Sequence, residues 1–189
     1  MTDPHSDPRP LVLLGVTGSI AAFKACDIAR GLMEHDLRVQ VILTESGARF
    51  ITPLTFHALT GIPPLVDMFD PPEPRQVPHI ELAQSAALYL IAPCTANVIG
   101  KITHGLADDL VSVIAMATRA PILIAPAMNP AMYESRIVQE NEAALTKRGI
   151  HFIGPVEGKL AAHWEGGGRG RMSDPGEIVK MALELLGAG

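Results

Sequence analysis

The chain has 189 residues and a formal net charge of −5; 48% of its residues are hydrophobic and 19% are charged. This length suits one domain that buries a core without metals or disulfides. The composition is too apolar for a disordered chain, and no apolar run reaches the ~18–20 residues of a membrane-spanning helix. The excess of acidic residues leaves no basic surface for nucleic acid. The two cysteines, Cys26 and Cys94, form no disulfide framework, lack the spacing of a zinc site and are typical of a reducing cytoplasm.

Residues 1–10 are polar and proline-rich, which is unlike a signal peptide and predicts a disordered tail before a single domain at residues 11–189. Short apolar runs follow without polar alternation, a pattern typical of strands buried on both faces of a parallel sheet. These runs are Leu11–Val16, Val39–Leu43, Leu88–Ala92, Pro121–Ala125 and His151–Ile153.

Helical patterns lie between and after these runs, at Ile20–Met33, Asp109–Ala117, Ser135–Lys147 and Gly176–Leu186. Strands that alternate with helices are joined by right-handed crossovers. The pattern therefore predicts an α/β fold with a doubly wound parallel sheet.

Two long segments interrupt this pattern. Residues 62–78 are rich in proline and predict a surface connection, whereas residues 154–170 are rich in glycine but contain Leu160 and Trp164. Loops of this size are usually lids or binding loops, and the alternative is a flexible surface segment. We expect the second segment to be a substrate flap that orders when substrate binds, because glycine raises the entropic cost of ordering it.

The first strand-to-helix turn, GVTGSI at residues 15–20, combines glycines with hydroxyl residues. Such a turn lets backbone N–H groups and a helix N-terminus hold an anion, with Thr17 and Ser19 as further donors. The turn matches neither GxGxxG nor the Walker A pattern, so it favours a single phosphate over a dinucleotide or a nucleoside triphosphate. The alternative is an ordinary tight turn capped by Ser19.

Small polar residues also follow two further strands, in TESGA at residues 44–48 and APCTAN at residues 92–97. Ligands of open α/β sheets bind beyond the carboxyl ends of the strands, so three such turns together favour a phosphate-bearing cofactor at that edge. Each turn by itself is also consistent with helix capping.

Asn129 and His79 have chemistry suited to a substrate. Asn129 follows a predicted strand, where its amide can hydrogen-bond a carboxylate and where Met128 and Met132 offer an adaptable apolar wall. His79 begins a predicted helix and can accept or donate a proton near neutral pH. The alternatives are a capping asparagine and a solvated histidine at a helix end.

Taken together, these motifs resemble those of the flavin-containing cysteine decarboxylases. That family includes phosphopantothenoylcysteine decarboxylase and the peptidyl-cysteine decarboxylases of lantibiotic and thioamide-peptide pathways. The matching motifs lie in the family's order: GVTGSIAA (15–22), TESGARF (44–50), PHIELA (78–83), APCTANVIGKI (92–102), GLADDL (105–110), APAMNPAM (125–132) and GRMSDP (170–175). The resemblance implies a Rossmann-like, flavodoxin-like sheet with FMN as cofactor. It also implies a cytoplasmic homotrimer, or a dodecamer of four trimers, with flavin and substrate between subunits.

The resemblance further implies residue roles. His79 would be the acid/base residue at the substrate thiol, Asn129 would hold the substrate carboxylate, and Met132, Arg171 and Met172 would bind the substrate. FMN would contact Gly18, Ser19, Ile20, Thr44, Ser46, Thr95, Ala96, Asn97, Val98 and Ala127.

The chemistry of this family overcomes the stability of a carboxylate on a saturated carbon. Oxidation of the cysteine CH2–SH group to a thioaldehyde by flavin provides the missing electron sink, and loss of CO2 then gives an enethiolate. The protein supplies orientation, a proton acceptor and carboxylate recognition.

Two features depart from the family pattern. Tyr133 stands where the family usually has Trp, and no cysteine follows Cys94, although phosphopantothenoylcysteine decarboxylases use a flap cysteine to protonate the enethiol. The fused ligase domain of many bacterial coenzyme A enzymes is also not in the sequence. We therefore expect oxidative decarboxylation of the C-terminal cysteine of a precursor peptide to an aminoenethiol, with flavin reoxidised by an external oxidant such as oxygen.

Three alternatives stay open. The first is phosphopantothenoylcysteine decarboxylation in coenzyme A biosynthesis, with His163 or another group in place of the flap cysteine. The others are a flavin prenyltransferase, which PHIELA and PAMNxxM disfavour, and a non-catalytic flavoprotein subunit.

Overall fold

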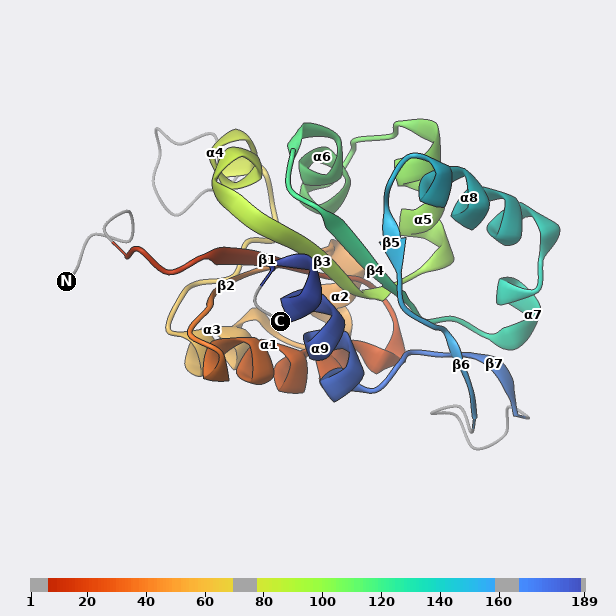
Figure 1. Cartoon of the computed structure of the whole chain (residues 1–189), viewed down its shortest axis with the longest axis horizontal. Coiled ribbons are helices and arrows are strands. Elements are labelled where there is room, and N and C mark those ends of the chain that lie inside the picture. The colour runs from red at the N-terminus through yellow and green to blue at the C-terminus, as the bar shows by residue number, and fades with distance from the viewer. Residues whose placement is uncertain (1–6, 70–77, 159–166, 188–189) are drawn as a thin grey trace.

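The computed structural model of the chain describes residues 7–69, 78–158 and 167–187 (Figure 1). A five-stranded parallel sheet in the order β2-β1-β3-β4-β5 runs through it. Each strand coincides with a predicted one to within about two residues at either end, so the doubly wound sheet is confirmed. The strands are β1 (Leu11–Val16), β2 (Arg38–Leu43), β3 (Ala86–Cys94), β4 (Ile122–Pro126) and β5 (His151–Phe152).

The predicted helices form, with one correction. The region expected as one helix at residues 20–33 is divided into a 3-10 turn and an α-helix at Lys24, because Ser19 caps a tight first turn. The elements expected from the sequence are η2 (Ile20–Lys24), α1 (Ala25–Glu34), α4 (Pro78–Ser85), α6 (Leu110–Ala117), α8 (Arg136–Lys147) and α9 (Pro175–Leu185).

Further helices have no counterpart in the apolar pattern of the sequence. They are short, and one contains glycine and β-branched residues, so tertiary packing rather than local preference stabilises them. These helices are α2 (Glu45–Phe50), α3 (Pro53–Thr60), α5 (Ala96–His104) and α7 (Pro130–Tyr133).

Alternate residues of each strand point into two separate cores. In β1, Val12 and Leu14 belong to one core and Leu11 and Leu13 to the other, and none of the four is more than 6% exposed. Helices α1, α3 and α9 cover the first face of the sheet, and α4, α5, α6 and α8 cover the second (Figure 1). Burial on both faces explains why the strands are continuously apolar.

The segment at 154–170 contains strands that the sequence analysis does not predict. Its two ends form the antiparallel strands β6 (Val156–Gly158) and β7 (Gly168–Arg171). Residues 159–166 of the predicted flap, which include His163 and Trp164, lie outside the described residues. So do residues 70–77 of the proline-rich segment and 1–6 of the predicted tail. Within the described ranges, no helix is both long and apolar enough to cross a membrane.

Candidate active site

The strand order reverses between β1 and β3, which creates a crevice at the carboxyl ends of these strands. From β1 the chain proceeds to β2 on one side, and β3, β4 and β5 follow on the other. In a doubly wound sheet this switch point is where ligands bind, and for the order found here it is where FMN sits in flavodoxins. The turns after β1, β2 and β3, which the sequence analysis selects, all lie at this edge.

Thr17 joins two of these turns from inside the protein. Its side chain is fully buried, its Oγ1 donates to the Pro93 carbonyl at 2.8 Å, and the Thr95 N–H donates to the same Oγ1 at 3.0 Å. This hydroxyl is therefore committed to the protein, and the expectation that Thr17 donates to a bound anion is wrong. Its role is to hold the end of β1 against the end of β3.

The turns after β1 and β2 are also held together. The Thr44 N–H donates to the Val16 carbonyl at 3.1 Å. A Cβ placed on Gly18 would lie 2.5 Å from the Ser46 Cβ, so glycine is needed at position 18 to let the two turns approach. The structure thus brings Gly18, Ser19, Thr44 and Ser46 to one place, as the cofactor prediction requires.

Three hydroxyl residues in the turns cap the helices that follow. The oxygens of Ser19, Thr44 and Thr95 accept from the backbone N–H groups of Ala21 at 3.3 Å, Gly47 at 3.0 Å and Val98 at 3.5 Å. The capping alternative is therefore correct, but it is compatible with ligand binding, because each hydroxyl keeps its own proton to donate. Helix N-termini also favour negative charge.

The residues at this edge fit a phosphate-bearing cofactor. The turns present hydroxyl groups and the N–H groups of first helical turns, and these donors lie near the point where Gly18 approaches Ser46. None of the expected contact residues is acidic, so no side-chain charge among them would repel a phosphate. Among the other expected contacts, Ala96 and Asn97 are accessible in the first turn of α5, Ile20 is 56% exposed, and Val98 is buried at 1% exposure. The Val98 side chain therefore offers no surface to a cofactor in this conformation, and its N–H donates to the Thr95 Oγ1.

The turn after β4 continues the same edge of the sheet. The Ala127 N–H donates to the Cys94 carbonyl at 2.9 Å, which places Ala127 beside the end of β3. Asn129 caps α7, with its Oδ1 accepting from the Ala131 N–H at 2.9 Å, and Met132 is 50% exposed. Asn129, Met132 and the expected cofactor contacts thus occupy neighbouring turns of one edge.

The hairpin β6–β7 packs against this turn. The Met128 N–H donates to the Gly170 carbonyl at 3.0 Å, and a Cβ on Gly170 would collide with the Met128 carbonyl. Arg171 lies on the same strand, where its Nη2 pairs with Asp174 at 3.3 Å and its Nε is buried without a described hydrogen-bond partner. Met172 is 1% exposed and lies in the core between the sheet and helices α1 and α9, so in this conformation it offers no surface to a substrate.

His79 is the expected site residue that the structure does not bring to the others. It lies in the first turn of α4, whereas Asn129 precedes α7, and these two helices are at opposite ends of the long axis of the molecule (Figure 1). Its Nδ1 is buried and has no hydrogen-bond partner among the described residues. One chain alone therefore does not contain a site that uses both His79 and Asn129.

The cysteines have no accessible thiolate. Cys94 is fully buried at the end of β3, and burial raises the pKa of its thiol far above the ordinary value. Burial also raises the pKa of Cys26, which lies in α1. Cys94 is therefore a core residue, and Cys26 packs partly buried against the other core.

The fold defines a flavodoxin-like protein, and the turns at one edge of its sheet fit a phosphate-bearing cofactor. The chain belongs to the Flavoprotein family, which it matches over residues 1–187. Coenzyme A biosynthesis bifunctional protein CoaBC of Bacillus subtilis (strain 168) is 44% identical over 171 residues, which are 90% of this chain and 42% of that protein. The chain thus spans less than half the length of this curated relative.

Two solved structures are similar over nearly the whole chain. A mutant of PPC decarboxylase complexed with pantothenoylaminoethenethiol has a TM-score of 0.80 at 30% identity, covering 92% of this chain and 96% of that one. The FMN-dependent cysteine decarboxylase SpaF has a TM-score of 0.78 at 26% identity, covering 95% and 98%. These likenesses confirm the expected resemblance to the flavin-containing cysteine decarboxylases, with FMN as the cofactor.

Proposed function

We propose that this chain is an FMN-dependent decarboxylase of phosphopantothenoylcysteine. This is the reaction of coenzyme A biosynthesis that the sequence analysis gives as the first alternative to a peptide substrate. The observation that carries this proposal is the 44% identity, over 90% of the chain, to a coenzyme A biosynthesis protein. Among the solved structures, the identity is 30% to the PPC decarboxylase mutant and 26% to the cysteine decarboxylase SpaF. The peptide substrate, which the sequence analysis favours because no cysteine follows Cys94, becomes the second candidate.

The expected site residues, taken from two copies of the chain, have the chemistry that this reaction needs. Bound FMN supplies the acceptor for the two electrons that leave the CH2–SH group of the substrate. His79 takes the thiol proton, and its buried Nδ1 without a described partner supports this assignment. With the Asn129 Oδ1 occupied by the Ala131 N–H, the Nδ2 end of the amide is the donor for the substrate carboxylate.

We propose that the complete site forms between subunits of a homotrimer, either alone or within a dodecamer. His79 and Asn129 lie on elements at opposite ends of one chain (Figure 1), so a second copy is needed to bring them together. Large apolar side chains on η2 and α2, beside the phosphate-binding turns, support self-association: Ile20 is 56% exposed, Phe23 55% and Phe50 53%.

The substrate is tested by mass spectrometry of the products formed from phosphopantothenoylcysteine and from a short peptide ending in cysteine. We expect loss of CO2 alone from phosphopantothenoylcysteine, with or without oxygen, because the hydride and the proton taken from the CH2–SH group are both returned to the product, with His163 or another group as proton donor in place of the flap cysteine. Loss of CO2 and two hydrogens from the peptide, with phosphopantothenoylcysteine unchanged, would instead establish the peptidyl enzyme. In that case oxygen or another oxidant is consumed.

Two variants test the residue roles in the same assay. Asn129→Asp should abolish turnover but retain flavin, because two carboxylates would face each other in the site. His79→Asn should do the same by removing the proton acceptor, whereas His104→Asn, at the far end of α5, should keep full activity. Loss of flavin from Asn129→Asp would move this residue to a cofactor role, and an active His79→Asn would refute its assignment.

A further inference from the structure

The turn that carries Asn129 is bound to the β6–β7 hairpin by more than backbone contacts. The guanidinium carbon of Arg169, on β7, lies over the ring of Tyr133 at 5.4 Å from its centroid. The Arg169 Nε also donates to the Pro155 carbonyl at 3.1 Å, just before β6. Arg169 thus bridges the entry of the hairpin and the end of α7, a contact that the sequence analysis does not predict.

Helix α8 holds Tyr133 from its other side. The Gln139 Nε2 donates to the Tyr133 carbonyl at 2.7 Å. The Glu142 carboxylate, on the same helix, interacts electrostatically with the Tyr133 hydroxyl. Tyr133 is 4% exposed, so its ring has little room to move. The aromatic ring beneath Arg169 is therefore a fixed surface, as a cation–π contact requires.

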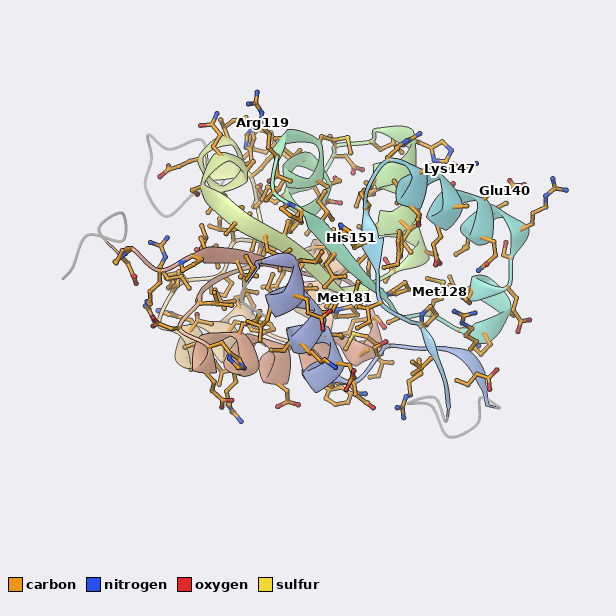
Figure 2. All side chains as sticks on the ribbon, in the orientation of Figure 1. Arg119, Met128, Glu140, Lys147, His151 and Met181 are labelled. Carbon is orange, nitrogen blue, oxygen red and sulfur yellow. The ribbon has the colours of Figure 1, made fainter. Side chains whose placement is uncertain are left out.

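The backbone that positions Asn129 lies between two contacts with β7, one at Met128 and one at Tyr133. Met128 (labelled in Figure 2) lies where the chain leaves β4 for α7, and its N–H donates to the Gly170 carbonyl at 3.0 Å. Asn129 is next in sequence, and Tyr133 follows one helical turn later. A shift of Tyr133 relative to β7 would therefore move the Asn129 amide as well.

We propose that Arg169 is a positioning residue that holds the turn at residues 127–133 against the β6–β7 hairpin and so fixes the Asn129 amide for the substrate carboxylate. The structural part of this inference is independent of the substrate, while its kinetic consequence rests on the proposed function. Tyr133, in the position where the family usually has Trp, supplies the ring for Arg169.

The first test uses hydrogen exchange, which needs no substrate. Arg169→Met in the full chain should speed exchange of the Met128 amide by about two- to fivefold, the range expected for loss of a solvent-accessible cation–π contact. Arg136→Met is the matched control, because Arg136 is also near α7 but pairs with Glu140 at the surface. It should leave this exchange unchanged, and equal exchange in Arg169→Met and the unmodified chain would overturn the proposal.

The second test is kinetic and separates positioning from general stability. Arg169→Met should raise KM by about the same two- to fivefold while kcat and flavin content stay unchanged. Tyr133→Leu removes the ring from the other side of the contact, so adding it to Arg169→Met should raise KM less than the product of the two single effects. Full multiplicativity, or a fall in flavin content without a change in KM, would show that Arg169 has a merely structural role. If neither substrate is turned over, the proposed function fails while the exchange result still decides the structural inference.

Discussion

The hydroxyl and amide residues of the site have different roles that depend on where each side chain points. Thr17 is buried and bonds to the protein, whereas Ser19, Thr44 and Thr95 cap helices at the edge where a ligand is expected. In the sequence these residues look alike, because each is a small polar residue after an apolar run. Whether such a hydroxyl bonds inside the protein, as in Thr17, or stays at the edge where a ligand is expected depends on its burial, and burial arises only when the strands assemble.

Glu142 gives a prediction at the residue scale. Partial burial raises the pKa of its carboxyl group above the ordinary value, so ionising this group costs the folded state more than it costs the unfolded chain. A raised carboxyl pKa means that the folded state binds the proton more tightly, so this group's contribution to stability falls as pH rises through the raised pKa. Glu142→Gln removes the charge and keeps a side chain of the same shape.

We therefore expect the thermal unfolding midpoint of Glu142→Gln, relative to the unmodified chain, to rise between about pH 4 and pH 7. Glu140→Gln is the control on the same helix, because its carboxylate pairs with Arg136 at the surface, where such pairs contribute little. A difference between Glu142→Gln and the unmodified chain that does not change with pH would contradict the assignment.

At the scale of elements, the site is built by close approach between turns rather than by any single helix. Gly18 makes the approach of the first two turns possible, since a methyl group there would collide with Ser46. We expect Gly18→Ala to lower the free energy of unfolding by about 1–3 kcal/mol, the usual cost of overpacking, and to reduce the FMN content of the purified protein.

A second glycine provides the control for this variant. A Cβ on Gly176, in the first turn of α9, would meet nothing within 4 Å. Gly176→Ala should therefore keep full FMN content and be neutral or stabilising, by up to about 1 kcal/mol. Visible absorbance and thermal unfolding of the two variants measure both effects. Normal flavin content in Gly18→Ala would show that the approach of the two turns is not needed for binding.

At the scale of the whole molecule, the proposed roles of His79 and Asn129 require association, because α4 and α7 lie far apart in one chain (Figure 1). We expect sedimentation equilibrium to give three chains per particle, or twelve if trimers assemble further. Phe23→Glu should dissociate the particle, because it places a charge among the exposed apolar residues of η2 and α2. Ile137→Glu, on an exposed position of α8, should leave the trimer intact. A fully active monomer would contradict a site shared between subunits.

The sequence by itself determined the sheet, the two-sided burial of its strands and the polar turns at the strand ends, where cofactor contacts are expected. These features are local or periodic: apolar runs of strand length, helix start signals such as Asp109, and polar turns at strand ends. Short helices such as α5 were missed, because neighbouring elements rather than local preference stabilise them. Strands β6 and β7 were missed because pairing between residues far apart leaves no signal in a glycine-rich stretch.

Only the tertiary structure decided which residues meet. It turned Thr17 inward, placed Arg169 over Tyr133 and set His79 far from Asn129. None of these outcomes follows from residue type or spacing, because each depends on how elements distant in sequence pack against one another. Motif order could therefore predict the kind of chemistry, while the distances and partners that the chemistry needs came from the fold.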